Sequence, residues 1–128
     1  MGRAAGATAT LSAIENYKEQ RRAEPFAAAV SLSPFCPYQL VRIDAPVLLL
    51  IGEKDDWTTI AGCEDIKLIE ALKYSVTTKI YPGVTHGFDV ERFEPFHYWG
   101  GHVSEYNPEA TQDAIVRIRE FLGRHLKK

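Results

Sequence analysis

The sequence has no long apolar run, no excess of either charge and only two cysteines. No uninterrupted apolar segment approaches the roughly 20 residues of a membrane-spanning helix, so a membrane protein is not expected. The 15 basic and 17 acidic residues give a net charge of −2, and only residues 124–128 are locally basic. This balance favours neither nucleic acid nor an anionic membrane as a partner.

The N-terminus also lacks recognisable targeting signals. No basic segment followed by an apolar stretch is present, and Gly6 stands where an N-myristoylation motif has Ser or Thr. Cys36 and Cys63 do not make a disulfide framework. One pair could form, but two buried free thiols are the expected state, and a cytoplasmic location follows. With 128 residues, 45% of them hydrophobic, the chain is expected to form one domain with a core.

Predicted helices and strands alternate along the chain. The helices are expected at residues 4–20, after Thr58 or Thr59, and after an N-cap at Asn107, and the strands within 26–32, 46–52 and 76–83. This alternation predicts an α/β fold with about three parallel strands flanked by helices. The first of these strands has no visible neighbour on its outer side, which suggests that part of the sheet is missing.

Two predicted helices carry apolar residues on one face. The stripes are Ile60, Cys63, Ile66, Ile69 and Leu72 in the second helix, and Ala114, Ile115, Ile118, Phe121 and Leu122 in the last. Both stripes are expected to face the sheet.

Reactive side chains follow two of the predicted strands. The segment "GEKDDWT" places Asp55 and Asp56 after one strand, and "PGVTHGFD" places His86 after the next. Singly, an aspartate pair is more often a turn or helix cap, and a lone histidine is more often an ordinary loop residue. Ligands of open α/β sheets bind at these strand ends, so the combination favours the carboxylate–histidine pair of hydrolytic catalysis.

The first residues have the frame of a nucleophile elbow. "GRAAG" at residues 2–6 matches G-x-S-x-G except that Ala4 replaces the serine, although a run of small residues entering a helix gives the same letters. The order of nucleophile position, acid and histidine along the chain is that of α/β-hydrolases.

Four segments, "FAAAVSLSPFCP", "PVLLLIGEKDDWT", "KIYPGVTHGFD" and "YNPEATQDAIVRIREFLGRHL", resemble the second half of the dienelactone hydrolase family of α/β-hydrolases. The resemblance runs from Gly2 onward and implies that residues 1–128 form a single partial α/β-hydrolase domain. It implies Asp55 as catalytic acid, with Asp56 as the fallback, His86 as catalytic histidine and Ala4 at the nucleophile position. The Ala5 N–H would be one oxyanion donor. The implied substrate is a small ester or lactone, and no cofactor is implied, since triad hydrolysis needs only water.

Two departures bear on activity. Alanine cannot form the covalent intermediate. The resemblance implies further strands before the elbow and a loop that gives the second oxyanion donor, and these are expected to be missing from this chain. The chain alone is therefore expected not to turn over an ester. One alternative is a non-catalytic module that binds a small molecule near Asp55 and His86, or that pairs through an open sheet edge as a homodimer or with a complementing chain. Another is a poorly folded remnant with exposed apolar surface.

Residues 91–106 form a predicted loop rich in aromatic residues. Phe93, Phe96, Tyr98 and Trp99 are expected either to wall a substrate pocket beside His86 or simply to pack in the loop. No metal is predicted, because the spacing of His97 and His102 matches no known metal site. Combining them with His86, Glu91, Glu94 or Glu105 does not change this. Cys36 lacks the surroundings of a nucleophile, and Cys63 is expected in the core.

Overall fold

The computed structural model describes residues 1–15, 26–36, 43–58, 60–65 and 75–127. They contain a four-stranded parallel sheet whose strands lie in chain order: β1 (Gly2–Arg3), β2 (Ala29–Leu32), β3 (Val47–Gly52) and β4 (Val76–Tyr81). The predicted α/β class and parallel sheet are confirmed. The predicted strand number was one too low, because β1 has only two residues and no apolar run marks it in the sequence.

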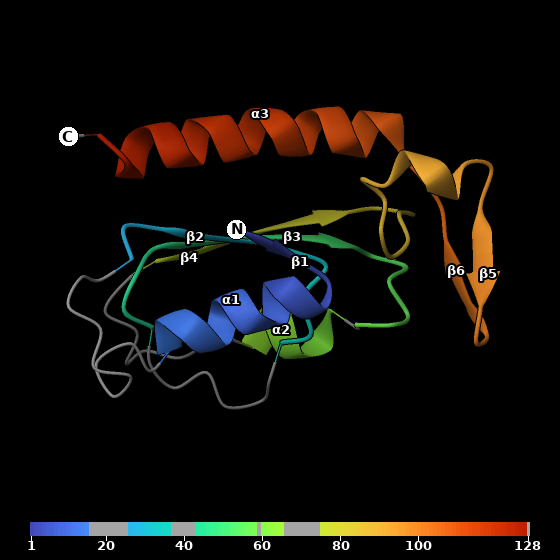
Figure 1. The fold of residues 1–128 in the computed structure, drawn as a ribbon, viewed down its shortest axis with the longest axis horizontal. Coiled ribbons are helices and arrows are strands. Elements are labelled where there is room, and N and C mark those ends of the chain that lie inside the picture. The colour runs from blue at the N-terminus through green and yellow to red at the C-terminus, as the bar shows by residue number, and fades with distance from the viewer. Residues whose placement is uncertain (16–25, 37–42, 59, 66–74, 128) are drawn as a thin grey trace.

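Helices cover both faces of the sheet (Figure 1). The first helix, α1 (Ala5–Glu15), and the short α2 (Ala61–Asp65) lie on one face, and α3 (Pro108–His125) crosses the other. Residues 16–20 of the first predicted helix, and Ile66, Ile69 and Leu72 of the second, lie outside the described residues.

Two apolar clusters fill the spaces between the sheet and these helices. One contains Leu11 and Ile14 of α1, and the other contains Ala114 and Phe121 of α3. All of β2 and β3 is buried, as expected for central parallel strands, which are covered on both faces.

The last helix begins as its sequence predicts. The Asn107 side chain accepts a hydrogen bond from the Ala110 N–H at 2.9 Å, and Pro108 is the first helical residue. Ala114 and Phe121 face the core, but Ile115 is 38% exposed, so its assignment to the inward stripe was wrong. Ile115 is rotated about 100° from Ala114 around the helix, toward the outer side of β1. Among the described residues β1 is the edge strand of the sheet, so no further strand covers Ile115 on that side.

An antiparallel hairpin lies in the segment predicted as an aromatic loop. It consists of β5 (His97–Trp99) and β6 (His102–Ser104), preceded by the single 3₁₀ turn η2 (Glu91–Phe93). Gly100 and Gly101 connect the strands with φ angles of 58° and 85°, as a tight two-residue hairpin turn requires. The hairpin stands beyond the carboxyl ends of the parallel strands (Figure 1).

The cysteine prediction was wrong. Cys36 and Cys63 form a disulfide with their Cα atoms 5.0 Å apart, which joins the segment after β2 to α2. Cys63 is fully buried, as predicted for a core position. The expected cytoplasmic location was inferred from free thiols, and the disulfide removes that reason for it. None of the described helices is long and apolar enough to cross a membrane.

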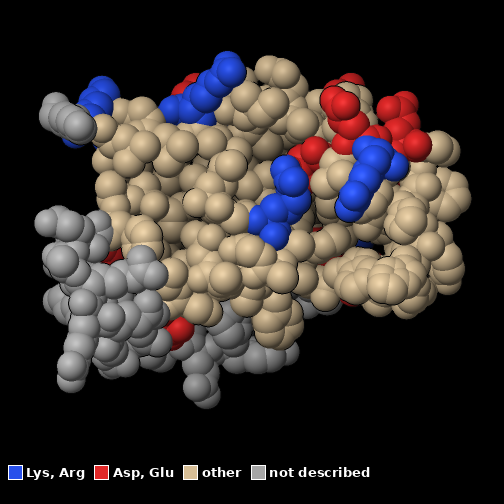
Figure 2. All heavy atoms as spheres, viewed as in Figure 1, with Lys and Arg blue, Asp and Glu red and all other residues tan. Residues whose placement is uncertain are grey.

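Charged side chains of both signs occur on the face shown in Figure 2. Acidic groups gather near the beginning of α3, with basic side chains close by, and uncharged surface separates the remaining charges.

Candidate active site

The turn between β1 and α1 has the geometry of a nucleophile elbow. Ala4, between the two elements, has a φ of 50°, in the left-handed region that non-glycine residues rarely adopt. Its N–H donates to the Leu32 carbonyl oxygen at 2.9 Å, and its carbonyl accepts from the Thr8 N–H at 3.1 Å. A sharp, strained turn from strand to helix is the conformation that exposes the nucleophile in α/β-hydrolases.

Gly2 permits the close approach of the two arms of this turn. A Cβ atom at Gly2 would lie 2.1 Å from the carbonyl oxygen of Gly6, so no larger residue fits without movement of the backbone. The helix itself begins at Ala5, where the backbone N–H has no acceptor within the helix.

Asp55 is held by its own loop after β3. Its side chain is fully buried, and Oδ1 accepts hydrogen bonds from the backbone N–H groups of Trp57 at 3.0 Å and Thr58 at 2.9 Å. The Thr58 hydroxyl donates to Oδ2 at 2.9 Å. These donors fix the carboxylate and satisfy it in a buried place, where an unpaired charge would be costly.

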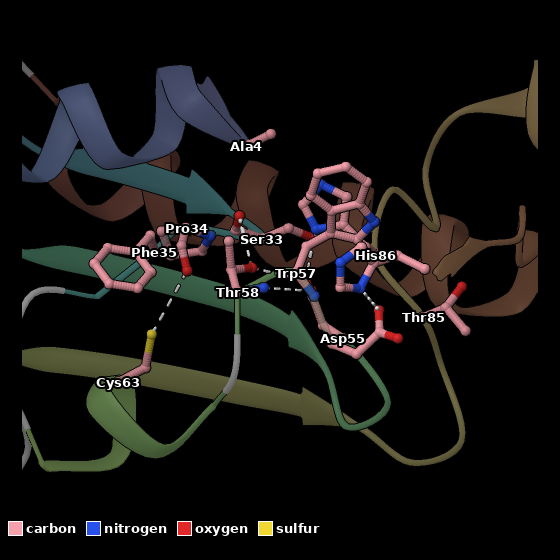
Figure 3. Close-up of polar contacts among 12 residues, drawn as sticks. Ala4, Ser33, Pro34, Phe35, Asp55, Trp57, Thr58, Cys63, Thr85 and His86 are labelled. Carbon is pink, nitrogen blue, oxygen red and sulfur yellow. Dashed lines mark hydrogen bonds and ion pairs between the residues drawn. The ribbon is translucent and has the colours of Figure 1, made fainter. Parts of the chain in front are cut away.

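His86 completes a pair with this carboxylate (Figure 3). Its Nδ1 lies 2.8 Å from Oδ2 of Asp55, and its side chain is 15% exposed. In the tautomer with its proton on Nδ1, the imidazole donates this hydrogen bond to the carboxylate and leaves Nε2 as an acceptor. The Thr85 hydroxyl accepts a hydrogen bond from the Glu105 N–H at 2.9 Å, which ties the His86 loop to the segment after β6.

The neighbouring carboxylate, Asp56, does not reach His86. It is about half exposed, and its Oδ1 lies 3.2 Å from Nδ1 of His102, in a geometry that does not make a hydrogen bond. The structure thus brings Asp55, rather than the fallback residue, to the histidine.

Ala4 and His86 line the same cavity, of about 490 Å³. The remaining lining residues are Arg3, Gly87, Val90, Arg92 and Phe93. The elbow residue and the imidazole therefore line one space.

A second cavity, of about 240 Å³, lies on the hairpin side of His86. Its lining consists of Trp57, His86, Arg92, Phe93, His97, Trp99, His102 and Ser104. Phe93 and Trp99 thus line a cavity beside His86, which is the first of the two arrangements expected from the sequence. Phe96 and Tyr98 are 59% and 64% exposed and line neither cavity.

Trp57 and Arg92 also line these cavities, and neither was predicted from the sequence. Trp57 directly follows the aspartate pair, and an aromatic residue on a strand-end loop was a usable signal. Within the described ranges, no three His, Cys, Asp or Glu side chains lie close enough together to hold a metal ion.

Residues 6–126 match the family model described as the Dienelactone hydrolase family. The chain belongs to this family. No curated protein sequence matches it. Among solved structures, it is similar to a dienelactone hydrolase-like promiscuous phosphotriesterase from metagenomic libraries, with 17% identity and a TM-score of 0.72 over 97% of this chain and 50% of that one.

Two further structures are similar. They are a putative dienelactone hydrolase from Klebsiella pneumoniae, with 20% identity and a TM-score of 0.69, and esterase PE8, with 22% identity and a TM-score of 0.54. The matches cover 95% and 93% of this chain, and 50% and 47% of the other chains. At these identities the likeness shows the fold, and the chain spans about half the length of the structures it matches.

Proposed function

We propose that this chain carries the acid–histidine part of an ester- or lactone-hydrolysing site, with Ala4 at the nucleophile position. The observation that carries the proposal is the 2.8 Å contact between His86 and the buried Asp55, in a cavity that Ala4 also lines. A buried, fully hydrogen-bonded carboxylate on a histidine at the strand ends is the arrangement that general-base hydrolysis uses.

Each residue has a separate role in this proposal. Asp55 holds the imidazole in the tautomer with the proton on Nδ1 and stabilises the imidazolium. With a serine at position 4, as in Ala4→Ser, His86 would accept the hydroxyl proton at Nε2 while the serine oxygen bonds to the carbonyl carbon. The Ala5 N–H, at the beginning of α1, donates to the oxyanion of the tetrahedral intermediate. The Ala4 methyl group cannot attack a carbonyl carbon, so the chain forms no acyl-enzyme by itself.

A complementing polypeptide, or a second copy of the chain, is the proposed partner at the outer edge of β1. Beside this edge lies a largely apolar cavity of about 420 Å³, lined by residues of β1, β2 and α3 and by Met1 and Asp89. Unpaired strand edges favour association. Size-exclusion chromatography with light scattering over a range of concentrations tests for the second copy.

The alternative function is a non-catalytic module that binds a small ester or lactone without cleaving it. Ala4 favours this alternative, because it lines the cavity beside His86 at the proposed nucleophile position and its methyl group cannot attack an ester.

Hydrolysis of 4-nitrophenyl acetate by the chain and by His86→Ala tests the proposal. Free imidazole groups also cleave activated esters, so only saturable turnover counts. The proposal expects no saturable turnover from either protein. Saturable turnover that the substitution abolishes would show that another nucleophile acts, and the assigned role of Ala4 would be wrong.

A further inference from the structure

Four of the aromatic rings that line the 240 Å³ cavity lie close together, and Trp57 is near the other three. Its ring centroid lies 4.5 Å from His102, 5.9 Å from His86 and 6.2 Å from Trp99. We call these four residues the aromatic cluster. It joins the Asp55 loop, the His86 loop and both strands of the hairpin.

The two tryptophans of this cluster are only partly covered by protein. Trp57 is 43% exposed and Trp99 is 62% exposed, although both belong to the wall of a cavity. Large apolar rings exposed beside a hollow are the surface on which a ligand ring packs.

We propose that the aromatic cluster binds one planar aromatic ring, as the aryl part of an ester whose carbonyl group lies at His86. The inference rests on the proposed function for the position of the ester group. The cavity is smaller than the 300–1,000 Å³ of sites for drug-sized ligands, which favours a single ring over a larger group.

The charges around the cavity disfavour a cationic ligand. Aromatic cages also bind quaternary ammonium groups, but Arg92 is part of this lining and no acidic residue of the described chain is. Asp56 lies next to His102 without being part of the wall. A neutral ring therefore fits better than a positively charged one.

Fluorescence excited at a wavelength that only tryptophan absorbs reports on this cavity, because Trp57 and Trp99 are the two tryptophans of the chain. The ligands are acetanilide and N-cyclohexylacetamide, which share an acetamide group and differ in having a planar or a puckered ring. We expect acetanilide to change the fluorescence saturably, with a Kd about fivefold lower than that of N-cyclohexylacetamide measured by competition.

Substitution of Trp99 gives a second test, since Trp57 remains as the reporter. Trp99→Ala is expected to raise the Kd for acetanilide about fivefold. Val116→Ala, on an exposed position of α3 away from the cavity, is the control and is expected to leave the Kd unchanged. Circular dichroism checks that the variants fold. If Trp99→Ala does not fold, the inference is tested by comparing the Kd values of the two ligands for the unmodified chain.

Three results would overturn the inference: equal affinity for the planar and puckered rings, tighter binding of phenyltrimethylammonium than of acetanilide, or an unchanged Kd in folded Trp99→Ala. Binding requires no catalysis, so its outcome is separate from that of the proposed function. Suppose that the unmodified chain binds acetanilide but the serine of the Ala4→Ser variant does not react. This pair of results would contradict the proposed function and leave the inference about ring binding intact.

Discussion

Nδ1 of His86 lies 2.8 Å from Oδ2 of Asp55, and the two residues come from loops that follow neighbouring strands. The carboxylate is fully buried and accepts hydrogen bonds from two backbone N–H groups and a hydroxyl as well. The hydrogen bonds from Trp57 and Thr58 hold the Asp55 loop together, so Asp55 is expected to contribute to stability as well as to the proposed chemistry.

Replacing Asp55 is expected to destabilise the chain far more than replacing its neighbour. Asp55→Ala leaves the Trp57 and Thr58 N–H groups without their acceptor and is expected to lower the free energy of unfolding by about 3 kcal/mol. Asp56→Ala, at a half-exposed position, is expected to cost less than about 1 kcal/mol. Urea unfolding of both variants measures the difference, and equal effects would contradict this account of the loop.

The two glycines of the elbow are expected to respond oppositely to alanine. At Gly2 the new Cβ would meet backbone atoms of Gly6, so Gly2→Ala is expected to destabilise the chain by about 2 kcal/mol or more. At Gly6 an added Cβ meets nothing within 4 Å, and Gly6→Ala in α1 is expected to stabilise it by about 0.5–1 kcal/mol. Thermal unfolding distinguishes the two, and similar Tm values for both variants would refute the elbow geometry.

Tyr81 is expected to make stability fall at alkaline pH. Burial raises the pKa of its phenol above the ordinary value of 10.0, and the hydrogen bond to Asp113 raises that pKa further. Above about pH 10 the unfolded chain releases a proton that the folded chain retains, so rising pH favours unfolding.

The matched variant for this prediction is Tyr81→Phe. It is expected to be about 1 kcal/mol less stable near neutral pH, through loss of the hydrogen bond, and to differ less from the unmodified chain at about pH 11. Urea unfolding at both pH values measures the gap. A gap that stays constant or widens with pH would rule out this role for Tyr81.

Reduction of the disulfide is expected to lower stability. Cys36 and Cys63 are 27 residues apart, and closing a loop of that length destabilises the unfolded chain by about 3.5 kcal/mol. Urea unfolding with and without a phosphine reductant measures the loss, and the Cys36→Ser, Cys63→Ser double variant is expected to behave like the reduced chain in both conditions. Titratable thiols in the denatured, unreduced protein would show that the bond is absent.

Local sequence signals predicted the elements that place the proposed site. These signals come from residues close together in the sequence. They are the apolar run that forms β3, the Asn107 cap of α3, and the positions of Asp55 and His86 directly after strands. Which of the two adjacent aspartates reaches the histidine depends on how the loop folds. The sequence resemblance favoured Asp55, and the contact itself is seen only in the structure.

Not every feature that depends on distant segments was predicted. The disulfide links residues 27 positions apart, and composition alone favoured free thiols. The exposure of Ile115 depends on the edge of the sheet, which its helical periodicity does not show. The hairpin is different, because two adjacent glycines between short aromatic and β-branched segments are a local turn signal that was overlooked.

Covalent labelling of an Ala4→Ser variant tests the central claim most directly. The claim is that Ala4 occupies the nucleophile position of a working acid–histidine pair. A fluorophosphonate that reacts with activated serines, followed by mass spectrometry of the labelled peptide, detects attack by Ser at this position with loss of fluoride. The account predicts labelling of Ala4→Ser, no labelling of the unmodified chain, and labelling at least about 100-fold slower when His86→Ala is added. A folded Ala4→Ser variant that is not labelled, or is labelled equally fast without His86, would contradict it.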